Sequence, residues 1–388
     1  MTRRGCRETP QEPRLRIGLN LLYLLPGIVG GTESYASGLL HGLAEVDRQN
    51  EYLVFVNKES QEWPLPQAPN FTRVNCPVSA SSRIQRYLFE QLRLPRLLRR
   101  YSIQVVHSLG YTSPLFASCH TVVTVHDLNY QAFGSWMPAT RRAALELIVR
   151  QSSLRASRII AVSEFSRREI CREFGLSASG VAVIHEAASA ARPGGPSADK
   201  TVTFGRLGIT DPYALAFSSW GPNKNISRLL RAFSDAKRQY PLPHQLVLVG
   251  HAPERGREKA ISSDGTVVFT GYLDQESLQA VLRGADFLVF PSLYEGFGLP
   301  VLEAMAAGVP VACSNTASLP EVAGDAASYF DPTAIDDMAQ KIVQLALNPG
   351  LRGALREKGY LNVRRFSWER AARETIAVYE AVGAGGKS

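Results

Sequence analysis

Two glutamates, Glu295 and Glu303, stand eight positions apart on either side of a glycine turn in the segment FLVFPSLYEGFGLPVLEAMAAGVPVACS. The apolar run FLVF predicts a buried strand, and Pro300 suits the first turn of a helix that runs to about Ala307. A helix amino terminus beside a glycine loop offers unpaired N–H groups and a partial positive charge, which suit a phosphate. Ionised carboxylates accept hydrogen bonds from hydroxyl groups. The segment therefore predicts a site for a phosphate with hydroxyl groups nearby, as in ribose or another sugar.

Spacing alone leaves a plainer interpretation open, in which Glu303 is a solvated helix residue and the glycines mark an ordinary tight loop. The glutamate pair and the EGFGLP run, however, resemble the Glu-x7-Glu motif of retaining glycosyltransferases, specifically family four. In that family the first glutamate contacts the transferred sugar, the loop amides meet sugar and phosphate, and the second glutamate binds the ribose. The resemblance implies these roles for Glu295, for the loop residues and for Glu303. The loop residues are Phe297, Gly298 and Leu299.

A second glycine loop, LLPGIVGGTE, follows the predicted strand RLRIGLNLLY and precedes a helix predicted from about Glu33 to Ala44. Gly30 and Gly31 could bring backbone amides to a phosphate or sugar, as GG(x)E loops do in the first domain of the family. A turn that only needs positive φ is an equally open interpretation.

Two predicted strands, IQVVHS and HTVVTVHDL, carry histidines near their carboxyl ends, His107 and His126. Ligands of open α/β sheets bind at such strand ends. His126 and Asp127 match the His-Asp pair that similar enzymes place beside the donor sugar. The resemblance implies a sugar-contacting, reaction-supporting role for His126 and an acceptor-side contact for Asp127. His107 is the lesser candidate, because a histidine at one strand end is usually satisfied by a backbone partner.

Lys224 stands where the loop WGPNK turns into a helix, and its ammonium group could neutralise a diphosphate. The family commonly pairs this lysine with an arginine just after the preceding strand or directly before the lysine. Ser219 and Asn223 occupy those places here, and Ser219 is counted among the predicted nucleotide-sugar contacts. Either Lys224 carries more of the phosphate binding or an arginine from elsewhere substitutes.

The nucleotide base is expected near two further strand ends. HQLVLVG ends at Gly250, and the loop after it could reach a base. The resemblance also places the base against backbone groups around Tyr272 and Leu273. Backbone contacts conceal which base is bound.

One segment departs from the family pattern. VAVIHEA is predicted to close the first domain where the family usually reads closer to VIPNGV, so His185 and Glu186 have no assigned role. Nearby, Ser163 is a predicted helix N-cap, and Glu321 in SLPEVAGDAASYFDP is interpreted as structural.

A chain of 388 residues is long for one domain and comfortable for two. A stretch rich in Pro, Gly, Ala and Ser, residues 187–200, is typical of a linker. The resemblance implies the GT-B architecture of the α/β class, with two Rossmann-like doubly wound parallel-sheet domains that face a central cleft. The predicted parts are a disordered tail (1–14), an acceptor-side domain (15–188), a linker (189–205), a nucleotide-sugar-binding domain (206–365) and a terminal helix that returns to the first domain (366–388).

Lys and Arg number 43 against 35 Asp and Glu, and the net charge of +8 suggests an anionic partner. The segment from Arg83 to Arg100 predicts a helix whose arginines face outward and whose apolar residues face the core. Those apolar residues are Ile84, Tyr87, Leu88, Leu92 and Leu94. The basic face is either a solvated surface or a surface that attracts anionic lipid headgroups. Nucleic acid is disfavoured, because no helix-turn-helix, zinc-finger or RNP signature accompanies the charge.

The five cysteines are scattered without a CxxC pair, which argues against a disulfide framework and a zinc site. Residues 1–14 have no apolar core, so we expect no signal peptide, and no segment reaches the ~20 apolar residues of a membrane span. We expect a cytoplasmic protein, with a place on the inner face of the plasma membrane if the basic helix binds lipid.

Taken with the resemblance, these features predict a retaining hexosyltransferase that uses a nucleotide diphosphate sugar. The segments around His126 look most like bacterial mannosyltransferases that build surface polysaccharide, so the first expectation is mannose from GDP-mannose to a glycan or lipid-linked acceptor. No Asp-x-Asp motif is present, and we expect neither a metal nor another cofactor. The alternatives are a GT-B sugar-nucleotide epimerase and a non-catalytic binding protein for nucleotide sugars or membrane surfaces. A dehydrogenase is disfavoured because no GxGxxG is followed by an acidic residue.

Overall fold

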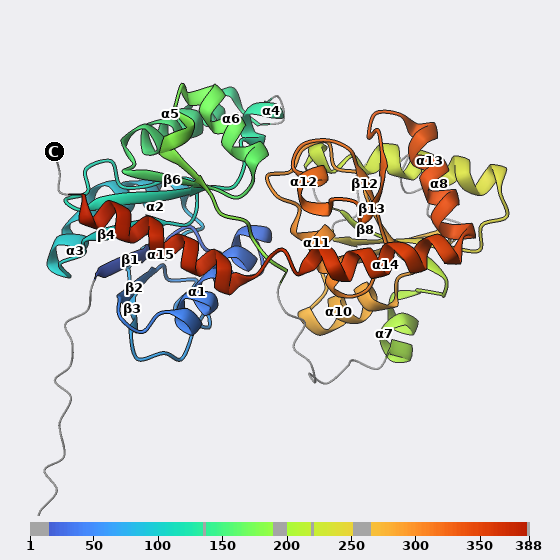
Figure 1. Ribbon diagram of the computed structural model, residues 1–388, viewed down its shortest axis with the longest axis horizontal. Helices are drawn as coiled ribbons and strands as arrows, with labels where there is room; N and C mark the ends of the chain where they lie inside the picture. Colours follow the sequence, from blue (N-terminus) through green and yellow to red (C-terminus); the bar gives the residue numbers. More distant parts are fainter. Residues whose placement is uncertain (1–14, 135–136, 189–199, 219–220, 251–264, 386–388) are drawn as a thin grey trace, which may run out of the picture. The chain divides into compact units, whose positions relative to one another are not determined.

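The structure is a computed structural model that describes the chain except residues 1–14, 135–136, 189–199, 219–220, 251–264 and 386–388 (Figure 1). The predicted tail and most of the predicted linker lie outside the described residues. The chain forms two compact units: residues 1–124, 151–159 and 372–388 make up unit 1, and residues 125–150 and 160–371 make up unit 2.

The first sheet has seven strands in the order β3-β2-β1-β4-β5-β6-β7. β1 pairs in parallel with β2 on one side and β4 on the other, so the strand order reverses beside β1. In such sheets the carboxyl ends at this reversal form the ligand-binding edge. The strands are β1 (Arg16–Asn20), β2 (Glu51–Val56), β3 (Phe71–Asn75), β4 (Val105–Ser108), β5 (His120–Val125), β6 (Arg158–Ala161) and β7 (Val181–Val183).

The second sheet has six strands in the order β10-β9-β8-β11-β12-β13, and its paired strands are parallel. The reversal lies between β8 and β11, where the loops carrying Lys224 and Glu295 begin. The strands are β8 (Tyr213–Ser218), β9 (Gln245–Gly250), β10 (Val267–Gly271), β11 (Phe287–Phe290), β12 (Val311–Ser314) and β13 (Ala327–Phe330). All four residues of β11 are buried, as the continuous apolar run FLVF predicts.

Helices connect the parallel strands, as parallel pairing requires. In the first half of the chain they are α1 (Gly31–Val46), α2 (Arg83–Leu92), α3 (Leu94–Arg100), α4 (Asn129–Ala132), α5 (Ala139–Arg155) and α6 (Glu164–Phe174), with a 3-10 turn at Ala178–Gly180. In the second half they are the 3-10 turn Pro222–Lys224 and α7 (Lys200–Leu207), α8 (Ile226–Gln239), α10 (Gln275–Gly284), α11 (Leu299–Ala306), α12 (Leu319–Ala323), α13 (Ile335–Leu347), α14 (Pro349–Val363) and α15 (Trp368–Ala384).

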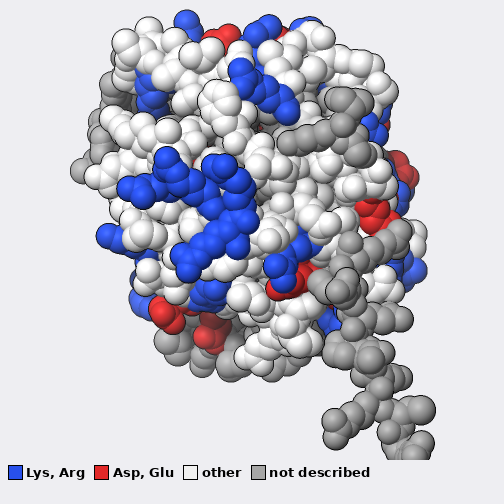
Figure 2. Space-filling view, turned by 90° about the vertical axis from the view of Figure 1, so that its left-hand side faces the viewer, with Lys and Arg blue, Asp and Glu red and all other residues white. Residues whose placement is uncertain are grey.

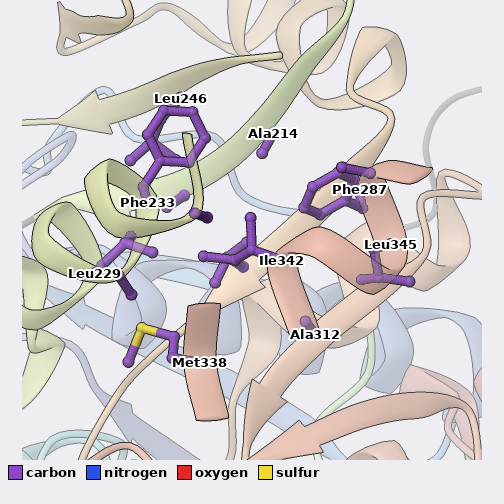
Figure 3. Close-up of a cluster of buried hydrophobic side chains, with 14 of the residues drawn as sticks. Ala214, Leu229, Phe233, Leu246, Phe287, Ala312, Met338, Ile342 and Leu345 are labelled. Carbon is purple, nitrogen blue, oxygen red and sulfur yellow. The ribbon is translucent and has the colours of Figure 1, made fainter. Parts of the chain in front are cut away.

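The core of the second sheet lies under α8 and α13. Figure 3 shows Leu229 and Phe233 of α8 and Ile342 of α13 gathered over side chains from the strands, among them Leu246 and Phe287. Each of these five side chains is buried. Truncation of a core phenylalanine typically costs ~3–5 kcal/mol, so this cluster is a main support of the sheet that carries β11.

The terminal helix α15 packs on the first sheet within unit 1 (Figure 1). The Tyr379 hydroxyl lies 2.6 Å from Nδ1 of His107. Gly383 approaches Leu15 so closely that a Cβ would lie 2.9 Å from Leu15 Cδ2. Ser367 accepts a hydrogen bond from the amide of Arg370 at 3.1 Å, so its side chain caps the start of α15.

The predicted basic helix from Arg83 to Arg100 differs from expectation in two ways. It is two helices, α2 and α3, because Pro95 starts a new helix. The prediction that Ile84, Leu88 and Leu92 face the core is wrong, since their exposed fractions are 75%, 55% and 59%. An amphipathic pattern has two faces, and the buried Glu90 shows that here the inward face of α2 is partly polar.

Candidate functional site

The loop between β11 and α11 is shaped by close backbone contacts within unit 2. A Cβ at Gly296 would lie 1.9 Å from the carbonyl oxygen of His126, and a Cβ at Gly298 would lie 2.7 Å from Cδ2 of Leu319. Gly298 also has φ 109°, a conformation that side chains other than glycine disfavour. Both positions of EGFG therefore require glycine.

Serine hydroxyls bind the carbonyl oxygens of this loop. The Ser318 hydroxyl lies 2.9 Å from the carbonyl oxygen of Glu295 and 2.7 Å from that of Phe297. Ser163, which also caps α6 as predicted, donates to the carbonyl oxygen of Gly296 at 2.6 Å. The carbonyl side of the loop is thus fixed in place.

The amide side of the same loop has the opposite character. The N–H groups of Phe297, Gly298 and Leu299 have no hydrogen-bond partner among the residues that the structure describes. Leu299 starts α11, with Pro300 in the first turn. Fixed, unpaired amides at a helix amino terminus favour an anion, so this edge can bind a phosphate or a sugar hydroxyl.

Lys224 and Glu295 form an ion pair beside these amides. Lys224 Nζ lies 2.6 Å from Glu295 Oε1, and both side chains are largely shielded from solvent. The ammonium also lies 5.5 Å from the centre of the Phe290 ring at the end of β11. The strand-end loops of β8 and β11 therefore bring together one cation and one carboxylate.

Two asparagines join these loops. Asn223, which occupies one of the places expected for an arginine, is buried; its side chain donates to the carbonyl oxygen of Tyr294 at 3.2 Å. Asn225, with φ 58°, donates to the carbonyl oxygens of Pro291 and Pro332 at 3.0 and 2.7 Å. Asn223 therefore holds the loop instead of offering a charge. Ser219, the other such place, lies outside the described residues.

Glu303 lies in α11, as predicted. Desolvation raises the pKa of its carboxyl group, and the negative charge of Glu186 raises that pKa further. Glu186 is therefore close enough to affect Glu303 electrostatically, although neither residue type nor spacing suggested it.

His126 follows β5 and is buried, and its partner is Glu186. His126 Nδ1 lies 3.1 Å from Glu186 Oε1, and the exposed fractions of the two residues are 6% and 4%. The carbonyl oxygen of His126 accepts a hydrogen bond from Ser166 at 2.9 Å. Asp127 accepts a hydrogen bond from the amide of Asn129, so one of its oxygens stabilises the local turn.

The residues expected at the base lie at the carboxyl ends of β9 and β10. Gly250 has φ 114°, and a Cβ there would lie 2.0 Å from the carbonyl oxygen of Ser218. Tyr272 is exposed and Leu273 is partly buried just after β10. Their contact with a base stays a prediction.

Gly30 and Gly31 belong to unit 1, and their contact with the donor stays a prediction. Gly30 has φ 58° and precedes α1, while a Cβ there would meet no atom within 4 Å. Glycine is therefore needed for backbone conformation at this position. Glu33 fixes the loop by accepting hydrogen bonds from the Gly27 amide and from Trp63 Nε1, at 2.8 and 3.0 Å.

Hydrogen bonds inside unit 1 account for the buried His107. Its Nδ1 lies 2.6 Å from the Tyr379 hydroxyl, and its Nε2 lies 2.8 Å from the Thr124 hydroxyl, which is also 3.0 Å from the Tyr35 hydroxyl. Both ring nitrogens are used inside the core of unit 1.

His185, which departs from the family pattern together with Glu186, also has a side-chain partner. His185 Nε2 lies 2.8 Å from Glu321 Oε1. Glu321 also accepts hydrogen bonds from the amides of Glu164 and Phe165 at the start of α6, which agrees with a structural role. Burial by itself would raise the pKa of the Glu321 carboxyl group. The hydrogen bonds from His185 and from the two amides outweigh burial, so this pKa lies below its ordinary value.

Among the residues that the structure describes, no helix combines the length and the hydrophobicity that spanning a bilayer requires. The same part of the chain holds no group of three or more His, Cys, Asp or Glu side chains placed to bind a metal ion.

Comparison with known proteins identifies the family. The family model described as "Glycosyl transferases group 1" matches residues 200–362, and the model "Glycosyltransferase Family 4" matches residues 29–192. The O-antigen chain mannosyltransferase B of Escherichia coli is 31% identical over 388 aligned residues, covering 96% of this chain and 98% of that protein. The chain belongs to glycosyltransferase family four.

One further sequence relative and one solved structure resemble this glycosyltransferase. The MMP alpha-(1->4)-mannosyltransferase of Mycolicibacterium hassiacum is 36% identical over 166 residues, covering 41% of this chain and 40% of that protein. The sucrose-phosphate synthase of Thermosynechococcus elongatus has a TM-score of 0.74 at 21% identity, covering 96% of this chain and 100% of the solved chain. The structural likeness shows the GT-B fold of two Rossmann-like parallel-sheet domains, which confirms the predicted fold class.

Proposed function

We propose that this glycosyltransferase moves mannose from GDP-mannose to a hydroxyl group of a glycan or lipid-linked acceptor, with retention of configuration. The support for mannose is that both relatives described above are mannosyltransferases. The observation that carries the chemistry is the pairing of Lys224 with Glu295 beside three amides that have no hydrogen-bond partner within the described part of the chain.

In this proposal each site group has one task. The amides of Phe297, Gly298 and Leu299 and the ammonium of Lys224 stabilise the diphosphate, whose negative charge grows as the sugar leaves. Glu295 orients the sugar through its hydroxyl groups. Glu303 accepts hydrogen bonds from the ribose.

Bond formation then needs no covalent enzyme intermediate. The acceptor hydroxyl attacks the anomeric carbon from the face that the diphosphate leaves, through an oxocarbenium-like state, and the departing phosphate oxygen takes the acceptor proton. The protein contributes position and electrostatic stabilisation. We propose that Lys224 and the loop amides supply this charge without a metal ion, so turnover should persist in EDTA.

Family membership supports transfer over the alternatives. An epimerase would convert the nucleotide sugar without an acceptor, and a binding protein would leave it unchanged, whereas both matching family models describe glycosyltransferases. Supplying an acceptor separates them, since only a transferase forms a glycosidic product.

The donor can be found without knowing the acceptor. A thermal-shift panel of GDP, UDP, ADP and their sugars should show the largest rise in melting temperature with GDP-mannose, because a ligand that binds only the folded state stabilises it. A larger rise with a UDP-sugar would overturn the choice of GDP-mannose while leaving the family unchanged.

We also propose that the acceptor side works at an anionic membrane, on the inner face of the plasma membrane. Ile84, Leu88 and Leu92 are four residues apart on α2, so they form one exposed apolar stripe. Exposed arginines accompany them on α2, on α3 and at the junction between these helices: Arg83, Arg93, Arg96, Arg99 and Arg100. Figure 2, viewed from the side where α3 lies in Figure 1, shows Lys and Arg side chains gathered with few acidic ones.

An apolar stripe flanked by arginines suits the interface of an anionic bilayer. The protein should cosediment with vesicles of phosphatidylglycerol but not with vesicles of phosphatidylcholine. Replacing Ile84 and Leu88 by serine should weaken this binding, whereas replacing the exposed Leu361 of α14 by serine serves as the control. Equal binding by both variants would contradict a role for the stripe.

A further inference from the structure

His126 and Glu186 form a buried pair that has no role in the reaction proposed above. We propose that Glu186 is a positioning residue for sugar transfer, whose carboxylate holds the His126 ring and fixes which ring nitrogen carries the proton. The proposal deepens the proposed function and rests on it, together with the sugar-contacting role that the family resemblance implies for His126.

The geometry comes from two strand ends of one sheet. His126 follows β5 and Glu186 lies three residues beyond the end of β7, with β6 between these strands. The residues are 60 positions apart in the chain, and 3.1 Å separates Nδ1 from Oε1. Both are buried, so the pair is protected from competing water.

A carboxylate fixes the tautomer of the ring. An ionised Glu186 has only acceptors, so the hydrogen bond requires the proton on Nδ1 of His126. When the ring is neutral, Nε2 then carries the lone pair and can accept a hydrogen bond from a sugar hydroxyl. Such outer partners commonly set the orientation and tautomer of functional histidines.

The backbone of His126 is held independently of Glu186. Its carbonyl oxygen accepts from Ser166, and Gly296 packs against the same oxygen. The Ser166 hydroxyl also lies 3.0 Å from the carbonyl oxygen of Gly296. Loss of Glu186 should therefore release the ring without moving the chain, and its effect should pass through the imidazole.

The neighbouring residue separates this role from simple packing. His185 bonds to Glu321, which in turn accepts a hydrogen bond from the amide of Glu164 at the start of α6. His185 therefore has the structural role in this segment. Glu186 bonds instead to the residue placed at the sugar, and its charge reaches Glu303. The two positions that depart from the family pattern thus have different partners.

A double-mutant cycle tests whether Glu186 acts through His126. With release of GDP from GDP-mannose as the assay, Glu186→Ala should lower kcat about 10–100-fold, the usual loss for an orienting partner. Glu186→Gln, whose carbonyl oxygen can still accept from Nδ1–H, should lower it less. In a His126→Ala background, Glu186→Ala should change kcat less than about twofold, because the ring it acts through is gone. Equal losses in both backgrounds would overturn the proposal.

A measurement without substrate keeps this test independent of the donor. In the NMR spectrum of protein labelled with 15N-histidine at a pH where the ring is neutral, the His126 signal, assigned by its loss in His126→Gln, should show the proton on Nδ1. In Glu186→Ala it should shift toward the tautomer with the proton on Nε2, while the control Glu173→Gln at an exposed ion pair leaves it unchanged. A proton on Nε2 in the unmodified protein would overturn the proposal, even if GDP-mannose is not the donor.

Discussion

The ammonium of Lys224 lies 2.6 Å from the carboxylate of Glu295, at the carboxyl ends of the strands where the second sheet reverses its order. Each group neutralises the other in the site as described. A donor that presents a diphosphate to Lys224 and sugar hydroxyls to Glu295 can replace this mutual contact with two separate ones. The two charged groups are therefore already placed for a ligand that is anionic at one end and carries hydroxyl groups at the other.

Replacing Lys224 by alanine should lower kcat about 10²–10³-fold, because removal of one positioned group that stabilises developing charge has this typical cost. Lys224→Arg should recover part of the rate by restoring the charge. Steady-state release of GDP from the donor measures both. Lys358→Ala, at an exposed ion pair with Asp325, is the matched control and should keep the full rate. A Lys224→Ala enzyme with unchanged kcat would remove the lysine from the mechanism.

The two glutamates should differ in which part of the donor they affect. Glu303→Gln should weaken binding of GDP itself about 10–100-fold, since a hydrogen bond to a charged group contributes ~1.5–3 kcal/mol. Glu295→Gln should leave GDP binding nearly unchanged and weaken only the sugar-dependent gain in affinity. Calorimetric titration of each variant with GDP and with GDP-mannose gives this comparison. If Glu295→Gln lost affinity for GDP and Glu303→Gln kept it, the assignment of Glu303 to the ribose and Glu295 to the sugar would be wrong.

Donor binding should also depend on pH through Glu303. Burial and the charge of Glu186 raise the pKa of this carboxyl, so its ionised, hydroxyl-accepting form is lost at a higher pH than for an ordinary glutamate. GDP affinity should therefore fall as the pH decreases through the raised pKa. Glu303→Gln should have weaker affinity that no longer changes with pH in that range.

Gly296→Ala should disrupt the loop, because the added Cβ would lie 1.9 Å from a backbone oxygen of His126. A displacement of this size typically costs ~1–3 kcal/mol of stability and should abolish most turnover. The matched control is Gly353→Ala in α14, where a Cβ meets no atom within 4 Å and helix propensity should add ~0.5–1 kcal/mol. Urea unfolding and the GDP-release assay measure both variants, and equal stability would show that the loop can yield at Gly296.

Glu90 should make the fold less stable at alkaline pH. It is buried in α2 and accepts hydrogen bonds from Asn20 and Thr112. Burial raises its pKa to about 7, above the ordinary value of 4.5, so the folded state favours the protonated form and stability falls as pH rises through 7. Between pH 5.5 and 8.5 this should remove about 2 kcal/mol from the free energy of unfolding. Glu90→Gln should lose none of it in urea unfolding at the two pH values.

The parts predictable from sequence are those encoded within a few positions. Glu295, the two glycines of its loop and Glu303 lie within nine residues, and the strand before them is a continuous apolar run. Strand, loop and helix therefore follow from local patterns, and parallel strands with helical connections follow from their alternation.

The parts not predicted depend on partners that are remote in the chain. Glu186 meets His126 across 60 positions, and Ser318 meets the Glu295 carbonyl across 23. The inward face of α2 was misassigned because Glu90 finds its partner Asn20 70 positions away, which leaves the leucines outside. A polar residue can be interpreted as buried only once its partner is known.

The most direct test of the nucleotide-sugar site is the formation of GDP from GDP-mannose by the full chain in EDTA, with a mannose-containing glycan as acceptor. Wild type should form GDP together with a product that retains the donor's anomeric configuration, and Glu295→Gln, folded by circular dichroism, should form about 10²-fold less. Equal rates of GDP formation by wild type and Glu295→Gln would contradict the proposed site.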